Sequence, residues 1–165
     1  MGSDLAVGPL GRYLEAHLDG FRGLRAVRKF SDGQSNPTYL LEADSGRYVL
    51  RRKPGGALLK SAHAVDREFR VLRALEGSDV PVARTLHLCA DEDVIGAMFY
   101  VMEFVQGRVF WNPVLPELEA GERAQVYDAM NATLAAIHSV DLEAAGLSDF
   151  GRPGGYYARQ FATWQ

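Results

Sequence analysis

Residues 47–76 read RYVLRRKPGGALLKSAHAVDREFRVLRALE, and this stretch decides the fold class. Its first six residues are rich in β-branched and aromatic side chains and predict a strand, which the Pro-Gly-Gly sequence then ends. The last part predicts a helix that Ser61 can cap and that runs to about Glu76, because Gly77 can end a helix. The stretch therefore predicts a helix beside a sheet.

A carboxylate on the apolar face of this helix is the main physical clue. Glu68 shares that face with Val65, Phe69 and Leu72. Because an unpaired buried carboxylate is costly, we expect a cation of the preceding strand to meet it. Strand alternation puts Arg51 and Arg52 on opposite faces, and we favour Arg51 as the partner. The alternatives are a purely structural salt bridge and a Glu68 that reaches solvent at the edge of the face.

The sequence on both sides of this stretch predicts further strands. They cover residues 26–30, 38–43, about 84–90 and about 97–104, and the turn at 44–46 forms a hairpin. A short helix begins near Pro9. The predicted fold class is α+β, with an antiparallel sheet of about five strands and a helix packed on it.

The composition changes after Gly107. Two prolines precede a helical run from about Glu119 to His138. Apolar residues recur in it at helical spacing and predict a face toward a core, namely Val126, Met130, Leu134 and Ile137. We expect one lobe at residues 1–106 and an incomplete, mainly helical second lobe at 107–165. The face around Met130 then stays exposed, which predicts a homodimer through that face.

Composition limits the function classes. The formal charge is -3, with 18 basic and 21 acidic side chains interspersed, so we expect no attraction to nucleic acid or to a membrane surface. Cys89 is the sole cysteine, which excludes an intrachain disulfide and a cysteine-based zinc site. The histidines lack metal-ligand spacing, and no signal peptide or membrane-spanning run occurs. We expect a cytoplasmic protein without a metal site in this chain.

Two more segments could bind a ligand. The turn between the first two strands contains one glycine and several polar side chains, and it includes Ser31, Gly33, Gln34, Ser35 and Asn36. Such a turn can cover phosphates, since glycine lets the backbone approach closely and exposed N–H groups donate to oxygen. An ordinary hairpin turn is the alternative.

The second segment is the apolar strand from Phe99 to Phe104, which runs toward Gly107. Backbone groups at its end could bind the edge of an adenine ring, with Met102 as a wall and Phe104 and Val105 against the ring. A core strand that ends at a turn is the alternative.

The order of these segments resembles the small lobe of a kinase. The sequence is similar to the aminoglycoside-phosphotransferase and choline-kinase superfamily, whose fold resembles that of protein kinases. It is most similar to the kinase-like domains associated with acyl-CoA dehydrogenases. The resemblance is carried by residues 33–39, 48–54, 61–69, 80–82, 99–104 and 134–138.

The resemblance implies a nucleotide site. Its cofactor-binding residues would be Ser31, Gly33, Gln34, Ser35, Asn36, Arg51, Glu68, Met102, Glu103, Phe104 and Val105. Arg51 would take the place of the protein-kinase lysine, and its planar fork suits phosphate oxygens. Met102 would guard the back of the adenine pocket, and the backbone of Glu103 and Val105 would bind adenine. The implied cofactors are ATP and Mg²⁺.

The family's catalytic motif, His-Gly-Asp followed after four residues by Asn, does not occur in the 165 residues. We therefore expect no catalytic or metal-binding residue in this chain and no activity from it alone. The resemblance implies transfer of the ATP γ-phosphoryl group to a small-molecule hydroxyl, such as that of a hydroxyacyl-CoA or hydroxy acid. The alternatives are a non-catalytic nucleotide-binding or regulatory module and a purely structural domain.

Overall fold

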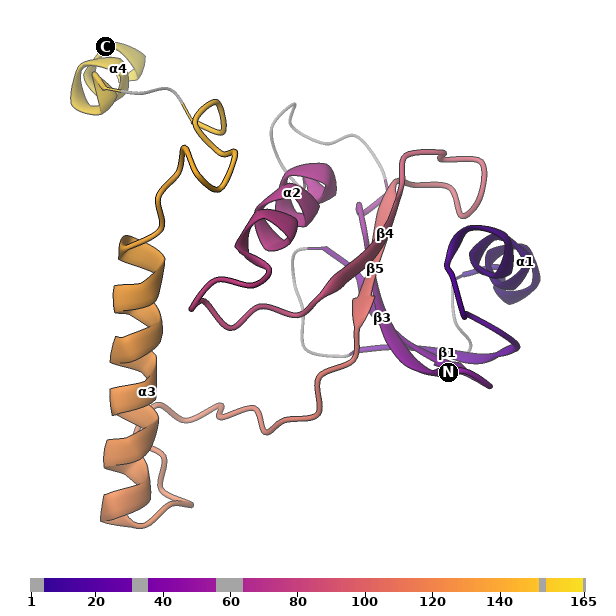
Figure 1. Ribbon diagram of the computed structural model, residues 1–165, viewed down its shortest axis with the longest axis horizontal. Helices are drawn as coiled ribbons and strands as arrows, with labels where there is room; N and C mark the ends of the chain where they lie inside the picture. The colour runs from indigo at the N-terminus through magenta and orange to yellow at the C-terminus, as the bar shows by residue number, and fades with distance from the viewer. Residues whose placement is uncertain (1–4, 31–35, 56–63, 152–153, 165) are drawn as a thin grey trace.

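The computed structural model describes residues 5–30, 36–55, 64–151 and 154–164 (Figure 1). Its elements are, in chain order, α1 (Val7–His17), β1 (Leu24–Lys29), β2 (Thr38–Ala43), β3 (Gly46–Arg52), α2 (Val65–Leu75), β4 (Thr85–Cys89), β5 (Phe99–Glu103), α3 (Ala120–His138) and α4 (Tyr156–Thr163). This order confirms the predicted α+β class.

The strands form a single antiparallel sheet in the order β1-β2-β3-β5-β4. β2 and β3 are joined by the predicted hairpin, with Ala43 opposite Gly46. β3 is the central strand, and its register places Arg51 between Thr38 of β2 and Tyr100 of β5. The sheet thus brings polar side chains from three strands to one place.

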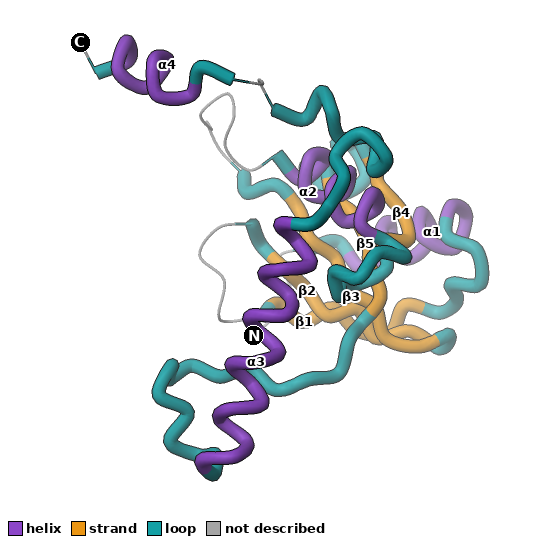
Figure 2. Tube along the Cα trace, turned by 60° about the vertical axis from the view of Figure 1, so that its left-hand side comes forward, coloured by secondary structure: helices purple, strands orange, loops and turns teal. Residues whose placement is uncertain are grey.

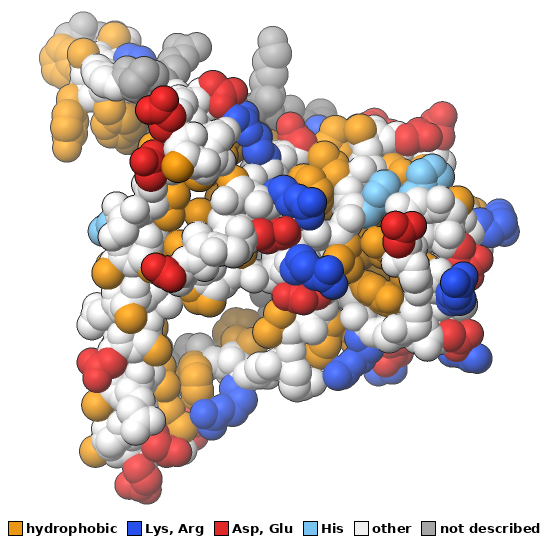
Figure 3. Space-filling view, viewed as in Figure 1, with side chains coloured by type: hydrophobic (Ala, Val, Ile, Leu, Met, Phe, Trp, Pro, Cys, Tyr) orange, Lys and Arg blue, Asp and Glu red, His pale blue; other side chains and the backbone are white. Residues whose placement is uncertain are grey.

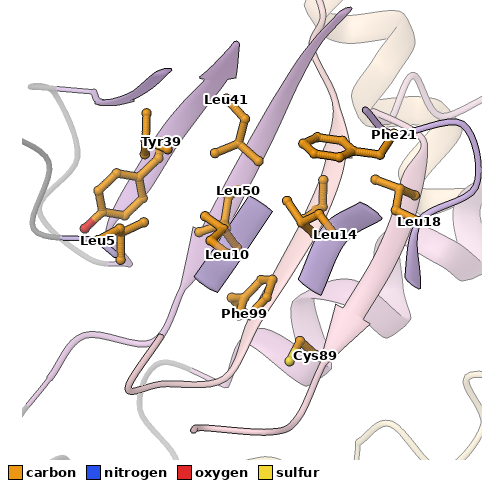
Figure 4. Packing of buried hydrophobic residues seen from close by; sticks show 12 residues of the cluster. Leu5, Leu10, Leu14, Leu18, Phe21, Tyr39, Leu41, Leu50, Cys89 and Phe99 are labelled. Carbon is orange, nitrogen blue, oxygen red and sulfur yellow. The ribbon is translucent and has the colours of Figure 1, made fainter. Parts of the chain in front are cut away.

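The helix α1 covers one face of the sheet and supplies the main core (Figures 1 and 4). Leu10 and Leu14 of α1 are fully buried and belong to the same cluster as Leu41, Leu50 and Phe99 of the strands. Leu50 points to this core because alternation directs it to the face opposite Arg51. The sequence predicted α1 but only one helix on the sheet, so α1 is an additional layer.

The helix α2 packs on the other face, against β4 and β5. It begins at Val65 with Ala64 at the N-cap, and the predicted cap, Ser61, lies outside the described residues. Gly77 follows its end with a positive φ of 81°, as the sequence predicted. The Glu76 carboxylate accepts hydrogen bonds from the N–H and the hydroxyl of Thr85, which tie the end of α2 to β4.

The helix α3 stands beside these layers, at the end of a long connection from β5 (Figure 1). It has no buried residue, and Met130 is 58% exposed. No element in the described part of the chain supplies a core for the apolar face that the sequence predicted. The predicted exposure around Met130 is confirmed.

The last helix, α4, lies at the C-terminal end and projects away from the sheet (Figure 2). None of the helices in the described ranges has both the length and the apolarity needed to cross a membrane. The division of the chain at residue 107 into two lobes stays a prediction.

Candidate functional site

The carboxylate of Glu68 is the centre of a polar network on the α2 side of the sheet. Arg51 donates from Nε to Oε2 of Glu68 at 2.7 Å, and Asn36 donates from Nδ2 to Oε1 at 2.6 Å. The Tyr100 hydroxyl also donates to Oε2, at 3.3 Å. The pairing of Glu68 with Arg51, which the sequence favoured over Arg52, is confirmed. Arg52 lies on the opposite face and donates to the carbonyl of Ile95.

The guanidinium of Arg51 is held on a second side by Thr38. Its Nη1 donates to Oγ1 of Thr38 at 3.2 Å, and that hydroxyl donates to the carbonyl of Asn36 at 3.0 Å. Within the described ranges, Nη2 makes no hydrogen bond, and 30% of the side chain is exposed. Arg51 is thus fixed in direction and keeps donors that can bind an anion.

Tyr100 keeps its proton near this network. Burial raises the pKa of its hydroxyl well above the ordinary value, and the nearby Glu68 carboxylate raises it further, while Arg51 opposes both. The hydroxyl therefore remains a donor to Glu68 at neutral pH. The ring of Tyr100 also meets Phe69 of α2 edge to face, at 6.0 Å between centroids. The sequence did not indicate a role in the site for Tyr100 or Thr38, because its pattern only placed them in strands.

A cavity of about 550 Å³ lies next to the Arg51–Glu68 pair. Its walls are formed by Arg51, Ala64, Arg67, Glu68, Val71, Leu72, Tyr100, Met102 and Phe150. The structure therefore brings Met102 together with Arg51 and Glu68, three of the predicted site residues. Phe150 was missed, because it comes from a loop distant in sequence with no motif of its own.

The segment after β5 has backbone groups that could hydrogen-bond the edge of an adenine ring. Neither the N–H nor the C=O of Val105 is hydrogen-bonded within the described ranges, and 62% of Val105 is exposed. The ring of Phe104 lies under the Arg47 guanidinium at 4.3 Å. The side chain of Glu103 accepts a hydrogen bond from the N–H of Arg84, and the N–H of Glu103 donates to the carbonyl of Arg84. Adenine binding by this segment stays a prediction.

The turn between β1 and β2 is described only at its end. Ser31, Gly33, Gln34 and Ser35 lie outside the described residues. Asn36 is 1% exposed and its amide is bound to Glu68, a contact that the sequence did not indicate. The end of the turn is thus attached to the same carboxylate that holds Arg51. Its contact with phosphate stays a prediction.

No group of three or more His, Cys, Asp or Glu side chains is arranged to hold a metal ion in the described ranges. The site therefore presents cationic and neutral donors around one engaged carboxylate. Such a set suits a phosphorylated ligand better than a bare cation.

Residues 26–165 match the model of the phosphotransferase enzyme family. The chain is 46% identical to a Ralstonia eutropha protein of known structure, assigned as an aminoglycoside phosphotransferase, with a TM-score of 0.82. That match covers 97% of this chain and 46% of the other.

Two curated proteins are also similar. The Arabidopsis thaliana protein named Probable acyl-CoA dehydrogenase IBR3 is 52% identical over 143 residues, covering 84% of this chain and 17% of that protein. Acyl-CoA dehydrogenase family member 11 of Gallus gallus is 48% identical over 162 residues, covering 96% of this chain and 21% of that protein. The chain thus spans about a fifth of the length of these curated relatives.

Proposed function

The chain belongs to the phosphotransferase enzyme family, and on that premise we propose that it forms the ATP-binding part of a small-molecule kinase. The observation that carries the proposal is the Arg51–Glu68 pair, oriented by Asn36, Thr38 and Tyr100. In kinases, a strand cation held by a helix glutamate contacts the phosphates of ATP.

The described residues fit ATP at two points. Arg51 keeps guanidinium donors for phosphate oxygens, and the backbone at Val105 keeps a donor and an acceptor for a base edge. We propose that the turn at 31–36 covers the phosphates. ATP would supply the phosphoryl group, and Mg²⁺ would neutralise its charge.

We further propose that the acceptor is a hydroxyl of a hydroxyacyl-CoA or a hydroxy acid. The support is indirect, because the similar curated proteins carry acyl-CoA dehydrogenase names and are about five times longer than this chain. A kinase next to an acyl-CoA dehydrogenase would have substrates of that chemical class close by. We propose a cytoplasmic location, in keeping with the single cysteine.

A second candidate function is a non-catalytic nucleotide-binding or regulatory module. The observation in its favour is that the described groups that fit ATP, Arg51 and the backbone of Val105, serve binding rather than phosphoryl transfer. An assay of ADP formation by this chain, with and without a hydroxyacyl-CoA, separates the two roles. We expect ATP binding without turnover; ADP that forms only with the acceptor would show that this chain is sufficient for catalysis.

A thermal-shift titration with Mg-ATP tests the binding proposal. At about 100-fold excess over Kd, a ligand stabilises the folded state by about 2.7 kcal/mol, which raises Tm by several degrees. We expect this rise for the wild type and its loss in Arg51→Ala. Arg52→Ala is the matched control, because Arg52 is the adjacent arginine on the opposite face. A nucleotide shift that persists in Arg51→Ala contradicts the proposed role.

A further inference from the structure

Two arginines of α2 reach the same short loop after α3. Arg70 donates from Nη1 to the Asp149 carboxylate at 3.0 Å, and its Nη2 donates to the other oxygen of that carboxylate and to the carbonyl of Gly146. Arg67 donates from Nη2 to the carbonyl of Phe150 at 2.7 Å, and its guanidinium lies 4.0 Å from the centroid of the Phe150 ring. We name the loop 146–150 with these two arginines the arginine clamp.

The arginine clamp touches the candidate site directly. Arg67 precedes Glu68 in α2, and both Arg67 and Phe150 line the cavity next to the Arg51–Glu68 pair. The segment that the clamp holds is therefore a wall of the same cavity. Figure 1 shows the loop between α3 and α4 close to α2, on the side away from the sheet.

The clamp acts on the N-terminal half of α2, which the fully buried Val65 also anchors. The C-terminal end of α2 is fixed to β4 through Glu76 and Thr85. The N-terminal half carries Glu68, whose contacts are those of the site itself. Arg67 and Arg70 add polar attachments to that half. They lie about one helical turn apart, and each donates to a backbone carbonyl of the loop.

We propose that the arginine clamp is a positioning device: it fixes α2 against the loop 146–150 so that Glu68 presents Arg51 to the nucleotide. The inference rests on the proposed ATP site. It makes Arg67 and Arg70 positioning residues and couples the geometry of the site to the part of the chain that follows α3.

The test compares ATP affinity and amide hydrogen exchange in variants of the 165-residue chain. Arg67→Gln with Arg70→Gln removes both guanidinium groups and keeps good helix formers. We expect the Kd for Mg-ATP to rise about fivefold or more, the lower end of coupling between separate sites. We also expect faster exchange in residues 64–70. Arg25→Gln is the matched control, since Arg25 forms a surface pair with Asp44 away from α2.

A double-mutant cycle with Arg51→Ala separates positioning from general stability. If the clamp acts through Arg51, adding the clamp substitutions to Arg51→Ala should not weaken ATP binding further. If the clamp acts independently of Arg51, the two losses of affinity should add. Exchanging the charges, Arg70→Asp with Asp149→Arg, should slow exchange in α2 relative to Arg70→Asp alone.

The two proposals fail in different ways. If Arg51→Ala weakens ATP binding but the clamp variant matches Arg25→Gln in both affinity and exchange, the clamp is overturned and the ATP site stands. If the wild type binds no ATP, the proposed function is lost. The exchange data then show whether the clamp holds α2. That role is overturned if the amides of α2 are as protected in the clamp variant as in the control.

Discussion

The two regions of the chain differ in how they bury apolar side chains. Residues 5–106 enclose a core in which Leu10, Leu14 and Leu50 are completely buried between α1 and the sheet. From residue 107 onward, α3 and α4 have no buried residue, and Trp164 is 85% exposed. Figure 3 shows orange apolar side chains along α3 and a hollow between α3 and the rest of the molecule.

The first region is thus stabilised by packing around one core, whereas the helices of the second region depend on local hydrogen bonds, and its buried side chains, Leu115, Leu118 and Leu147, lie in loops. The helix α3 begins with a capping box in which Glu119 and Glu122 satisfy each other's backbone N–H groups. Such caps hold a helix without tertiary contacts but add only about 1 kcal/mol each. The two regions should therefore respond differently to the same kind of substitution.

The largest expected effect comes from removing the same side chain in each region. Leu14→Ala in α1 should lower the free energy of unfolding by about 3 kcal/mol, because it leaves a cavity in the core. Leu134→Ala in α3, where half of the leucine is exposed, should cost less than about 1 kcal/mol. Urea unfolding measures both. The measurement is made at concentrations where the chain is monomeric, and an equal loss would then mean that other parts of the same chain cover α3.

A smaller effect is expected where α2 meets β4. Burial alone would raise the pKa of Glu76, but the hydroxyl and N–H of Thr85, with help from Arg73 and Arg84, hold it below its ordinary value of 4.5. A lowered folded-state pKa gives stability that is present above the ordinary value and is lost as the pH falls through the folded value. Glu76→Gln should lower the free energy of unfolding by about 1 to 2 kcal/mol at neutral pH. It should also reduce the further loss of stability as the pH falls.

Urea unfolding curves between about pH 7 and about pH 3 test whether stability falls with pH as expected. Glu143→Gln, an exposed change in the second region, is the control and should leave the pH dependence as in the wild type. If wild type and Glu76→Gln lose the same free energy of unfolding at acid pH, the hydrogen bonds to Thr85 do not set the stability of this junction.

The sequence predicted the first region well because its signals are local. The helix face indicated that Glu68 needs a cation, and strand alternation put Arg51 and Arg52 on opposite faces without saying which faces Glu68. Arg51, the favoured partner, forms the pair. The hairpin at 44–46 and the helix end at Gly77 depend on turn residues and also appear as expected. Local patterns, however, do not say which face of the sheet a helix covers, and the role of α1 was missed for that reason.

Contacts between distant segments could not be predicted. Arg70 and Asp149 are separated by 79 residues, and nothing in either segment indicates the other. The same holds for Asn36, whose polar side chain read as a surface group of a turn but is buried against Glu68. The helical spacing in α3 predicted an apolar face correctly, but spacing alone cannot show whether anything covers that face.

A third prediction concerns the start of α3. Glu119→Ala removes the capping box and should destabilise the first turns of α3 by about 0.5 to 1 kcal/mol. The thermal unfolding of the sheet should not change, because α3 does not contribute to its core. Amide exchange in residues 120–126 measures the local effect, and Glu117→Ala, just outside the helix, is the control. A lower Tm for the whole protein would show that α3 and the sheet unfold together.

The smallest effect on stability is expected on the exposed face of α3, where we propose that two copies of the chain associate. Met130 and Leu134 lie on a shallow apolar surface of α3 together with Val126 and Ile137. In the monomer, Met130→Gln with Leu134→Gln should leave the free energy of unfolding within about 0.5 kcal/mol of the wild-type value. The same change should reduce dimerisation, since it removes apolar area from the contact.

Sedimentation velocity over a range of concentrations tests this effect. The control is Val109→Gln with Val114→Gln, which removes two still more exposed apolar side chains from the connection before α3. If only the α3 variant becomes monomeric, the exposed face of α3 is the surface that joins the copies. If the wild type is already monomeric, or if both variants behave alike, that face is not a dimer interface.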